Sequence, residues 1–100
     1  MNMTDFLKLI RSKNEKWFSE TIGNPNGNPV RVRVMESFVA PFHVHEKEDE
    51  MFFVLSGDFF IDTEGESVHL KKGQSYTVPA GIKHRARAEV RVELVVIGGQ

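Results

Sequence analysis

The sequence contains no cysteine, and this absence removes several kinds of chemistry at once. A chain without thiols forms no disulfides, holds no thiolate zinc or iron–sulfur site, and has no cysteine nucleophile. Any metal chemistry must therefore use histidine and carboxylate side chains. The lack of cysteine is also compatible with a cytoplasmic protein, and this is the location that we predict.

Long apolar runs and an excess of one charge are missing as well. No apolar stretch approaches the roughly 20 residues that a transmembrane helix needs. Residues 1–11 do not resemble a secretory signal, because Asp5 comes early among only a few apolar residues. The net charge is −1, whereas a general nucleic-acid binder normally carries a basic face. We therefore predict neither a membrane nor a nucleic acid as partner.

The chain has 100 residues, which is the length of one domain with one core. Residues 4–10 (TDFLKLI) predict a short helix on the outside of the domain, with Thr4 as its N-cap. Residues 23–29 (GNPNGNP) predict a connecting loop. Within this single domain we distinguish an N-terminal helix and connecting segment, residues 1–29, from a β-rich part, residues 30–100.

Short β segments follow residue 29 and are separated by turn signals. Residues 30–34 alternate strictly between valine and arginine, as a half-buried strand does. The simplest interpretation turns the valines inward and leaves Arg31 and Arg33 in solvent. If that strand bulges, one of the two arginines reaches the pocket and binds a carboxylate or phosphate of a substrate. The other segments are 51–55, 59–61, 67–70, 75–78 and 90–97. Such a series is typical of an all-β antiparallel sandwich or barrel.

Two histidines and a glutamate lie close together in the middle of the chain. His43 and His45 are two residues apart, so that both project from the same face of an extended strand. Glu50 stands at an odd spacing from them, which would place it on the opposite face of a continuous strand. The polar residues 46–49 instead predict a bend that restores the parity before the next strand begins.

The remaining histidines lie farther along the chain. His84 follows a turn that Pro79 and Gly81 favour. We expect His69 to be an ordinary exposed residue on the polar face of a strand. Taken singly, His43, His45 and His84 are also compatible with surface positions in polar turns.

Read together, these positions form two motifs. The first is His43-x-His45-x4-Glu50-x6-Gly57, and the second is Gly73-x5-Pro79-x-Gly81-x2-His84. They resemble the two sequence motifs of the cupin superfamily, and the resemblance covers nearly all of the chain beyond residue 36. Residues 49–57 and 78–84 look like those of small stand-alone cupins described as mannose-6-phosphate isomerase-like. Ser37 and Ala88 depart from the usual glycine and asparagine, neither of which is a metal ligand in the family.

The resemblance implies a cupin double-stranded β-helix, or jelly-roll, barrel of about six to ten strands with a short N-terminal helix. It also implies that four side chains inside the barrel bind one divalent metal: His43, His45, Glu50 and His84. Three imidazoles and one carboxylate suit Fe, Mn, Co, Ni, Cu or Zn better than Ca or Mg. A divalent ion with one carboxylate ligand keeps a charge of about +1, which favours a small anionic or oxygen-rich ligand.

Alternation along residues 50–55 predicts what surrounds such a site. If Glu50 faces the interior, Phe52 and Val54 also point inward. Phe52, Val54 and Tyr76 are therefore candidates to line the pocket. Tyr76 is equally compatible with a core tyrosine whose hydroxyl is satisfied.

The outer face of the same strand is apolar too, because Met51, Phe53 and Leu55 point outward. Large exposed apolar patches are uncommon on monomers, so this face needs cover. The cover comes either from the N-terminal helix or from a second copy of the chain. Small cupins are commonly dimers, and we predict a homodimer.

No residue is predicted to be catalytic, because the sequence places no second titratable group as an obvious general acid or base. Two classes of function remain. One is a metal-dependent enzyme of the dioxygenase, isomerase or decarboxylase class that acts on a small oxygen-rich molecule. The other is a non-enzymatic module that binds a metal or a small ligand for sensing or storage. The fold does not choose between them.

Overall fold

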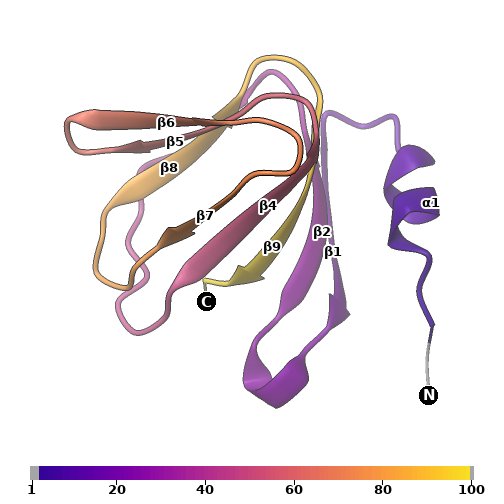
Figure 1. Cartoon of the computed structure of the whole chain (residues 1–100), viewed down its shortest axis with the longest axis horizontal. Helices are drawn as coiled ribbons and strands as arrows, with labels where there is room; N and C mark the ends of the chain where they lie inside the picture. The colour runs from indigo at the N-terminus through magenta and orange to yellow at the C-terminus, as the bar shows by residue number, and fades with distance from the viewer. Residues whose placement is uncertain (1–2, 100) are drawn as a thin grey trace.

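The computed structural model describes residues 3–99, and its strands form two antiparallel sheets that face each other (Figure 1). Sheet A has the order β1-β2-β9-β4-β7, and sheet B has the order β3-β8-β5-β6. The elements are α1 (Phe6–Arg11), β1 (Trp17–Gly23), a 3₁₀ turn (Pro25–Gly27), β2 (Val30–Met35), β3 (Phe38–Val39), β4 (Glu50–Ser56), β5 (Phe59–Thr63), β6 (Glu66–Leu70), β7 (Ser75–Val78), β8 (His84–Ala88) and β9 (Val92–Gly98). The predicted jelly-roll architecture with a short N-terminal helix is thereby confirmed. No helix among residues 3–99 is long and apolar enough to cross a membrane.

The main apolar core lies between the two sheets. Phe52 and Val54 of β4 point into it, as alternation predicted, and both are almost fully buried. Leu94 and Val96 of the neighbouring β9 lie beside them, while Phe59 and the rest of sheet B close the core from the other side. This core therefore holds the two sheets together.

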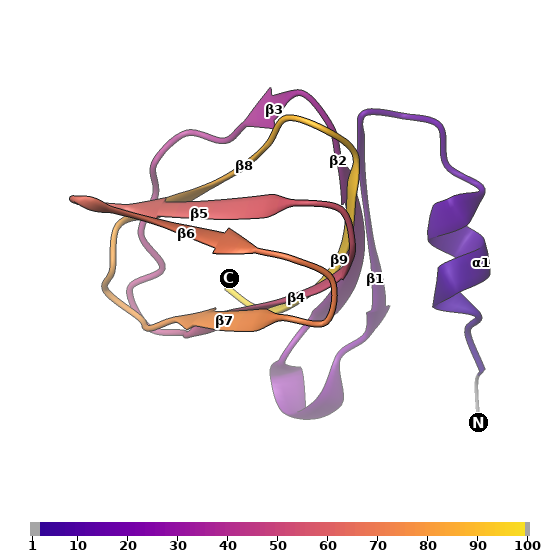
Figure 2. The same cartoon turned by 45° about the horizontal axis from the view of Figure 1, so that its top comes forward.

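A second apolar cluster lies on the outer face of sheet A, beneath α1. Val32 and Val34 of β2 are fully buried there, against Ile10 of the helix and Phe18 of β1. Figure 2 shows α1 separated from sheet B by sheet A. Helix α1 thus covers part of the outer face of sheet A.

The valines of β2 were predicted to face inward, and this prediction was wrong. Because α1 and β1 cover the outer face, Val32 and Val34 turn outward, and the β2–β9 register runs without a bulge. Successive residues of a strand point to opposite faces. Arg31 and Arg33 therefore face the interior of the barrel, on the same side as the buried Met35.

Three strands and one helix cap were not predicted correctly. Strand β1 lies within the segment that we had interpreted as connecting, and residues 23–29 form only its hairpin to β2. Strand β3 has two residues, and β8 (HRARA) buries small alanines that give little hydrophobic signal. The N-cap of α1 is Asp5 rather than Thr4, because the Asp5 carboxylate accepts a hydrogen bond from the Lys8 amide (3.1 Å).

An ion-pair cluster on the outer face of sheet B ties β5 to β8. Asp62 accepts hydrogen bonds from Arg85 Nε (2.9 Å), Arg87 Nε (2.7 Å) and Ser67 Oγ (2.6 Å). Burial raises the pKa of the Asp62 carboxyl, but these hydrogen bonds outweigh it and lower the pKa to about 2. Since the two arginines follow His84 in β8, the cluster anchors the strand that carries this histidine.

The substitution Asp62→Asn is expected to lower the free energy of unfolding by about 1–2 kcal/mol near neutral pH. A carboxyl whose pKa is depressed by folding stabilises the protein above its unfolded pKa, and this contribution is lost as the pH falls from about 4 to about 2. The difference between wild type and variant in urea unfolding should therefore shrink toward acid. A difference that stays constant with pH would contradict this account.

The matched control is Asp58→Asn, in the turn that precedes β5. The Asp58 carboxylate lies 2.7 Å from His69 Nε2, but its side chain is 47% exposed. Exposed ion pairs contribute little, so the control should change stability by less than about 1 kcal/mol.

Candidate metal centre

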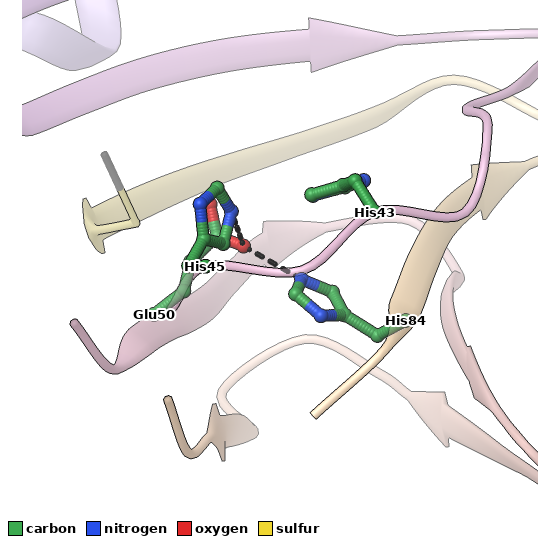
Figure 3. Close-up of side chains that lie close together, drawn as sticks. All are labelled: His43, His45, Glu50 and His84. Carbon is green, nitrogen blue, oxygen red and sulfur yellow. Dashed lines mark hydrogen bonds and ion pairs between the residues drawn. The ribbon is translucent and has the colours of Figure 1, made fainter. Parts of the chain in front are cut away.

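The structure brings together all four residues that the sequence analysis singled out as metal ligands (Figure 3). One ligand atom from each side chain can be chosen so that all lie within 4.8 Å of one another. Glu50 is the first residue of β4 and His84 is the first residue of β8. His43 and His45 lie on the extended segment between β3 and β4, which is not a continuous strand.

Backbone hydrogen bonds fix the spacing of these residues. His43 and His84 form an isolated antiparallel bridge, in which the His43 amide donates to the His84 carbonyl (2.9 Å) and the reverse bond is 3.0 Å. The His45 carbonyl accepts from the Gly81 amide (2.8 Å), and Asp49 Oδ1 accepts from the Ala80 amide (2.8 Å). The bend predicted before Glu50 is present. The hydrogen bonds to Gly81 and Ala80 connect this bend to the turn that precedes His84.

The ring orientation of two histidines is set by carbonyl groups. The Nδ1 atoms of His43 and His84 lie 3.0 Å from the Pro41 carbonyl oxygen and 2.8 Å from the Ile82 carbonyl oxygen, respectively. A carbonyl oxygen only accepts hydrogen bonds, so each Nδ1 must carry the proton that it donates. In a neutral ring the Nε2 atom then holds a lone pair, which is the arrangement typical of metal-ligating histidine.

Two imidazole nitrogen atoms converge on the carboxylate of Glu50. Its Oε1 lies 3.0 Å from His84 Nε2 and 3.3 Å from His45 Nε2. Glu50 and His84 are almost completely buried, and His45 Nε2 is a buried atom without a hydrogen-bond partner among the described residues. Lone pairs that face one another in a buried site repel unless a cation lies between them. The four side chains therefore fit a divalent metal ion.

The end of β9 packs directly against Glu50. Gly99 has a φ of +70°, and a Cβ at this position would overlap the Glu50 carboxyl group. The neighbouring Gly98 carbonyl accepts a hydrogen bond from Arg31 Nη2. A glycine at position 99 is thus required both by the backbone conformation and by the space that Glu50 occupies.

A cavity of about 190 Å³ opens beside these residues, and His43, Glu50 and His84 form part of its wall. Phe52, one of the candidate lining residues, is part of this wall. Val54 and Tyr76 were predicted to line it as well, but they pack in the main core and are not part of this wall. Both side chains point toward the interior, as expected. They are not part of the cavity wall because they lie at a different level along the barrel.

Trp17 and Arg33 are among the residues of the cavity wall that sequence reasoning did not place there. Trp17 belongs to the strand that was not predicted. Arg33 was recognised as a possible anion binder, but only if its strand bulged, whereas the outward turn of the valines brings it inside. Burial lowers the pKa of Arg33 to about 10, with a smaller contribution from Arg31 in the same direction and an opposing one from Glu50. The guanidinium therefore remains charged at neutral pH.

His69 lies outside the site, as predicted. Its side chain is partly exposed on β6, with Nε2 2.7 Å from Asp58 Oδ1. The imidazole is stacked on the Phe60 ring, with the ring centroids 4.4 Å apart.

Comparison with known proteins bears on the family and the fold of the chain. Residues 30–98 match the Cupin domain (Cupin_2) family. The chain is 33% identical over 90 residues to the uncharacterized protein YdbB of Bacillus subtilis (strain 168), covering 89% of this chain and 79% of that protein.

Two solved structures show the same fold. A cupin-2 domain containing protein from Shewanella frigidimarina has a TM-score of 0.87, with 23% identity and 97% and 94% of the two chains covered. TT1209 from Thermus thermophilus has a TM-score of 0.82, with 24% identity and 98% and 97% covered. From the match over residues 30–98 and the shared jelly-roll fold, we conclude that this chain belongs to the cupin domain family.

Proposed function

We propose that the protein binds one divalent transition metal through His43, His45, Glu50 and His84, and uses it to hold a small oxygen-rich anion in the cavity. The observation that carries this proposal is the convergence of Glu50 Oε1 with the Nε2 atoms of His45 and His84. The donor set of three imidazoles and one carboxylate suits Fe, Mn, Co, Ni, Cu or Zn. A bound ion supplies Lewis acidity, and a charge of about +1 remains after the carboxylate is counted.

The residues of the chain supply position and exclusion of water. The carbonyl groups of Pro41 and Ile82 hold the rings of His43 and His84 through Nδ1, and His84 Nε2 lies 3.0 Å from Glu50 Oε1. Phe52 and Ala86 form part of an apolar wall beside the site. A small ligand that enters the cavity therefore meets charge at the metal end and apolar surface along its side.

A purely binding role is the second candidate, and the composition of the cavity wall favours it. Among the described residues of that wall, Arg33 is the only ionisable side chain besides His43, Glu50 and His84. Arg33 stays protonated at neutral pH and is a poor general acid or base. An enzyme of the dioxygenase, isomerase or decarboxylase class would have to rely on the metal and its ligands.

The first test of the proposal is metal binding. His84→Ala and His43→Ala are expected to lower the affinity for Zn²⁺ or Mn²⁺ by about a hundredfold or more, because each removes a direct ligand. The measurement is isothermal titration calorimetry, supported by metal analysis of protein purified without a nickel column. His69→Ala is the matched control and should bind like wild type, since His69 lies on the outer face of sheet B. Unchanged affinity in both site variants would refute the metal site.

The second test separates the enzyme from the binding module. Fe(II)-loaded protein is mixed with diketones, thiols, phenols and sugar acids, and oxygen consumption and product formation are followed. We expect at least one of these compounds to raise the melting temperature of the metal-loaded protein. Melting shifts without turnover across the panel would support the binding module, whereas oxygen uptake or product formation that His84→Ala abolishes would support the enzyme.

We also infer a homodimer that forms through the outer face of β4. Helix α1 covers Leu55, but Met51 and Phe53 remain half-buried and are not part of the apolar cluster beneath the helix. We expect light scattering to give the mass of a dimer, and Phe53→Glu to give a monomer that still binds metal. A monomeric wild type would contradict the inference.

The cytoplasmic location and the likeness to mannose-6-phosphate isomerase-like cupins stay predictions.

A further inference from the structure

Arg33 places a positive charge on the wall of the cavity. In sheet A it stands opposite Leu94 of β9, whose side chain belongs to the core between the sheets. It shares the cavity wall with Met35, Phe52 and Ala86. A guanidinium in a partly desolvated, largely apolar space costs free energy unless a partner satisfies its charge.

The partners that the protein supplies to Arg33 are neutral. Arg33 Nε donates to Ser19 Oγ at 3.3 Å, and the guanidinium carbon lies 5.0 Å from the centre of the Trp17 ring. No carboxylate among residues 3–99 lies within ion-pair distance of it. Arg31, its neighbour on the same face, adds to the positive charge and binds the Gly98 carbonyl.

Other half-buried arginines of this chain have carboxylate partners. Arg85 and Arg87 pair with the buried Asp62, and Arg91 pairs with the buried Glu93. Three arginines on the outer faces, Arg85, Arg87 and Arg91, thus have carboxylate partners. Among the described residues Arg31 and Arg33 have none, and of these two only Arg33 is part of the cavity wall. This contrast indicates that the counter-charge of Arg33 comes from a ligand.

The cavity also limits the size and shape of that ligand. Its volume of about 190 Å³ corresponds to about six water molecules, and is below the roughly 300–1,000 Å³ of pockets for drug-sized ligands. The wall that Arg33 shares with His43, Glu50 and His84 also contains apolar side chains, Phe52 and Ala86 among them. A molecule that matches this wall has two polar ends and a short carbon skeleton.

We propose that Arg33 is a specificity-determining residue that binds the carboxylate of a small two-headed acid, whose second oxygen-bearing end is held at the His43–His84–Glu50 end of the cavity. This inference rests on the metal binding proposed above and adds the class of ligand. Guanidinium and carboxylate form strong charge-assisted hydrogen bonds, which are stronger still away from bulk water. Stacking on Trp17 limits the freedom of the guanidinium before the ligand arrives.

The test compares matched acids on the Zn²⁺-loaded protein by isothermal titration calorimetry. The probes are malonate, succinate and glutarate, each paired with the monocarboxylate of equal length: propionate, butyrate and valerate. We expect wild type to bind at least one dicarboxylate about tenfold more tightly than its monocarboxylate partner, and Arg33→Gln to lose this preference. Arg33→Lys keeps the charge without the guanidinium fork and should retain only part of it.

Two controls make the result specific to Arg33. Acetohydroxamate binds metal through its own oxygen atoms, so its affinity should be the same in wild type and Arg33→Gln if the metal end is intact. Arg11→Gln removes one positive charge from the exposed end of α1 and should behave like wild type. Circular dichroism verifies that each variant is folded.

The outcomes separate this inference from the proposed function. A wild type without preference for any dicarboxylate, or a preference that survives in Arg33→Gln, would overturn the role of Arg33 while leaving metal binding intact. A wild type that binds no Zn²⁺ would refute the proposed function instead. The same titrations on metal-free protein then decide the role of Arg33: loss of carboxylate binding in Arg33→Gln supports it, and unchanged binding overturns it.

Discussion

Helix α1 packs on the outer face of β2, and the alternation of side chains along this strand determines what each of its two faces receives. Val32 and Val34 are fully buried beneath α1, on the outside of the barrel. Burying a valine is worth about 1.5–3 kcal/mol, which helps to offset the cost of confining a guanidinium. Because the strand cannot turn its valines outward without turning its arginines inward, the packing of the N-terminal helix also sets the charge inside the cavity. Residues 3–29 are in this sense part of the site, although none of them belongs to the metal-binding cluster.

Much of the fold and the cluster could be predicted from the sequence, because the information is local. The motifs that contain His43, His45 and Glu50 resemble those of cupins, and this resemblance implied that the side chains converge. The orientation of β2 could not be predicted in the same way. An alternating strand shows that its two faces differ, but which face is inside depends on contacts with α1, which lies earlier in the chain. Strand β8 escaped notice because its buried residues beside His84 are alanines.

Two regions of the cavity wall have opposite electrostatic character. Around Glu50, carboxylate and imidazole lone pairs converge and call for a cation. On β2, Arg33 provides a cation that the described part of the chain does not pair with a carboxylate. Phe52 and Met35 belong to the wall of the same cavity and keep the dielectric constant low, so that neither charge is screened as it would be in water. The cavity is thus polarised before any ligand enters.

The backbone bridge between His43 and His84 has a consequence for how the site can evolve. The separation of these two positions is held by peptide groups, at 2.9 and 3.0 Å, and not by the imidazole rings themselves. A substitution at either position therefore exchanges a donor atom without displacing the opposite strand. Because metal preference follows the type of donor, descendants of this chain can alter their metal one residue at a time on an unchanged frame.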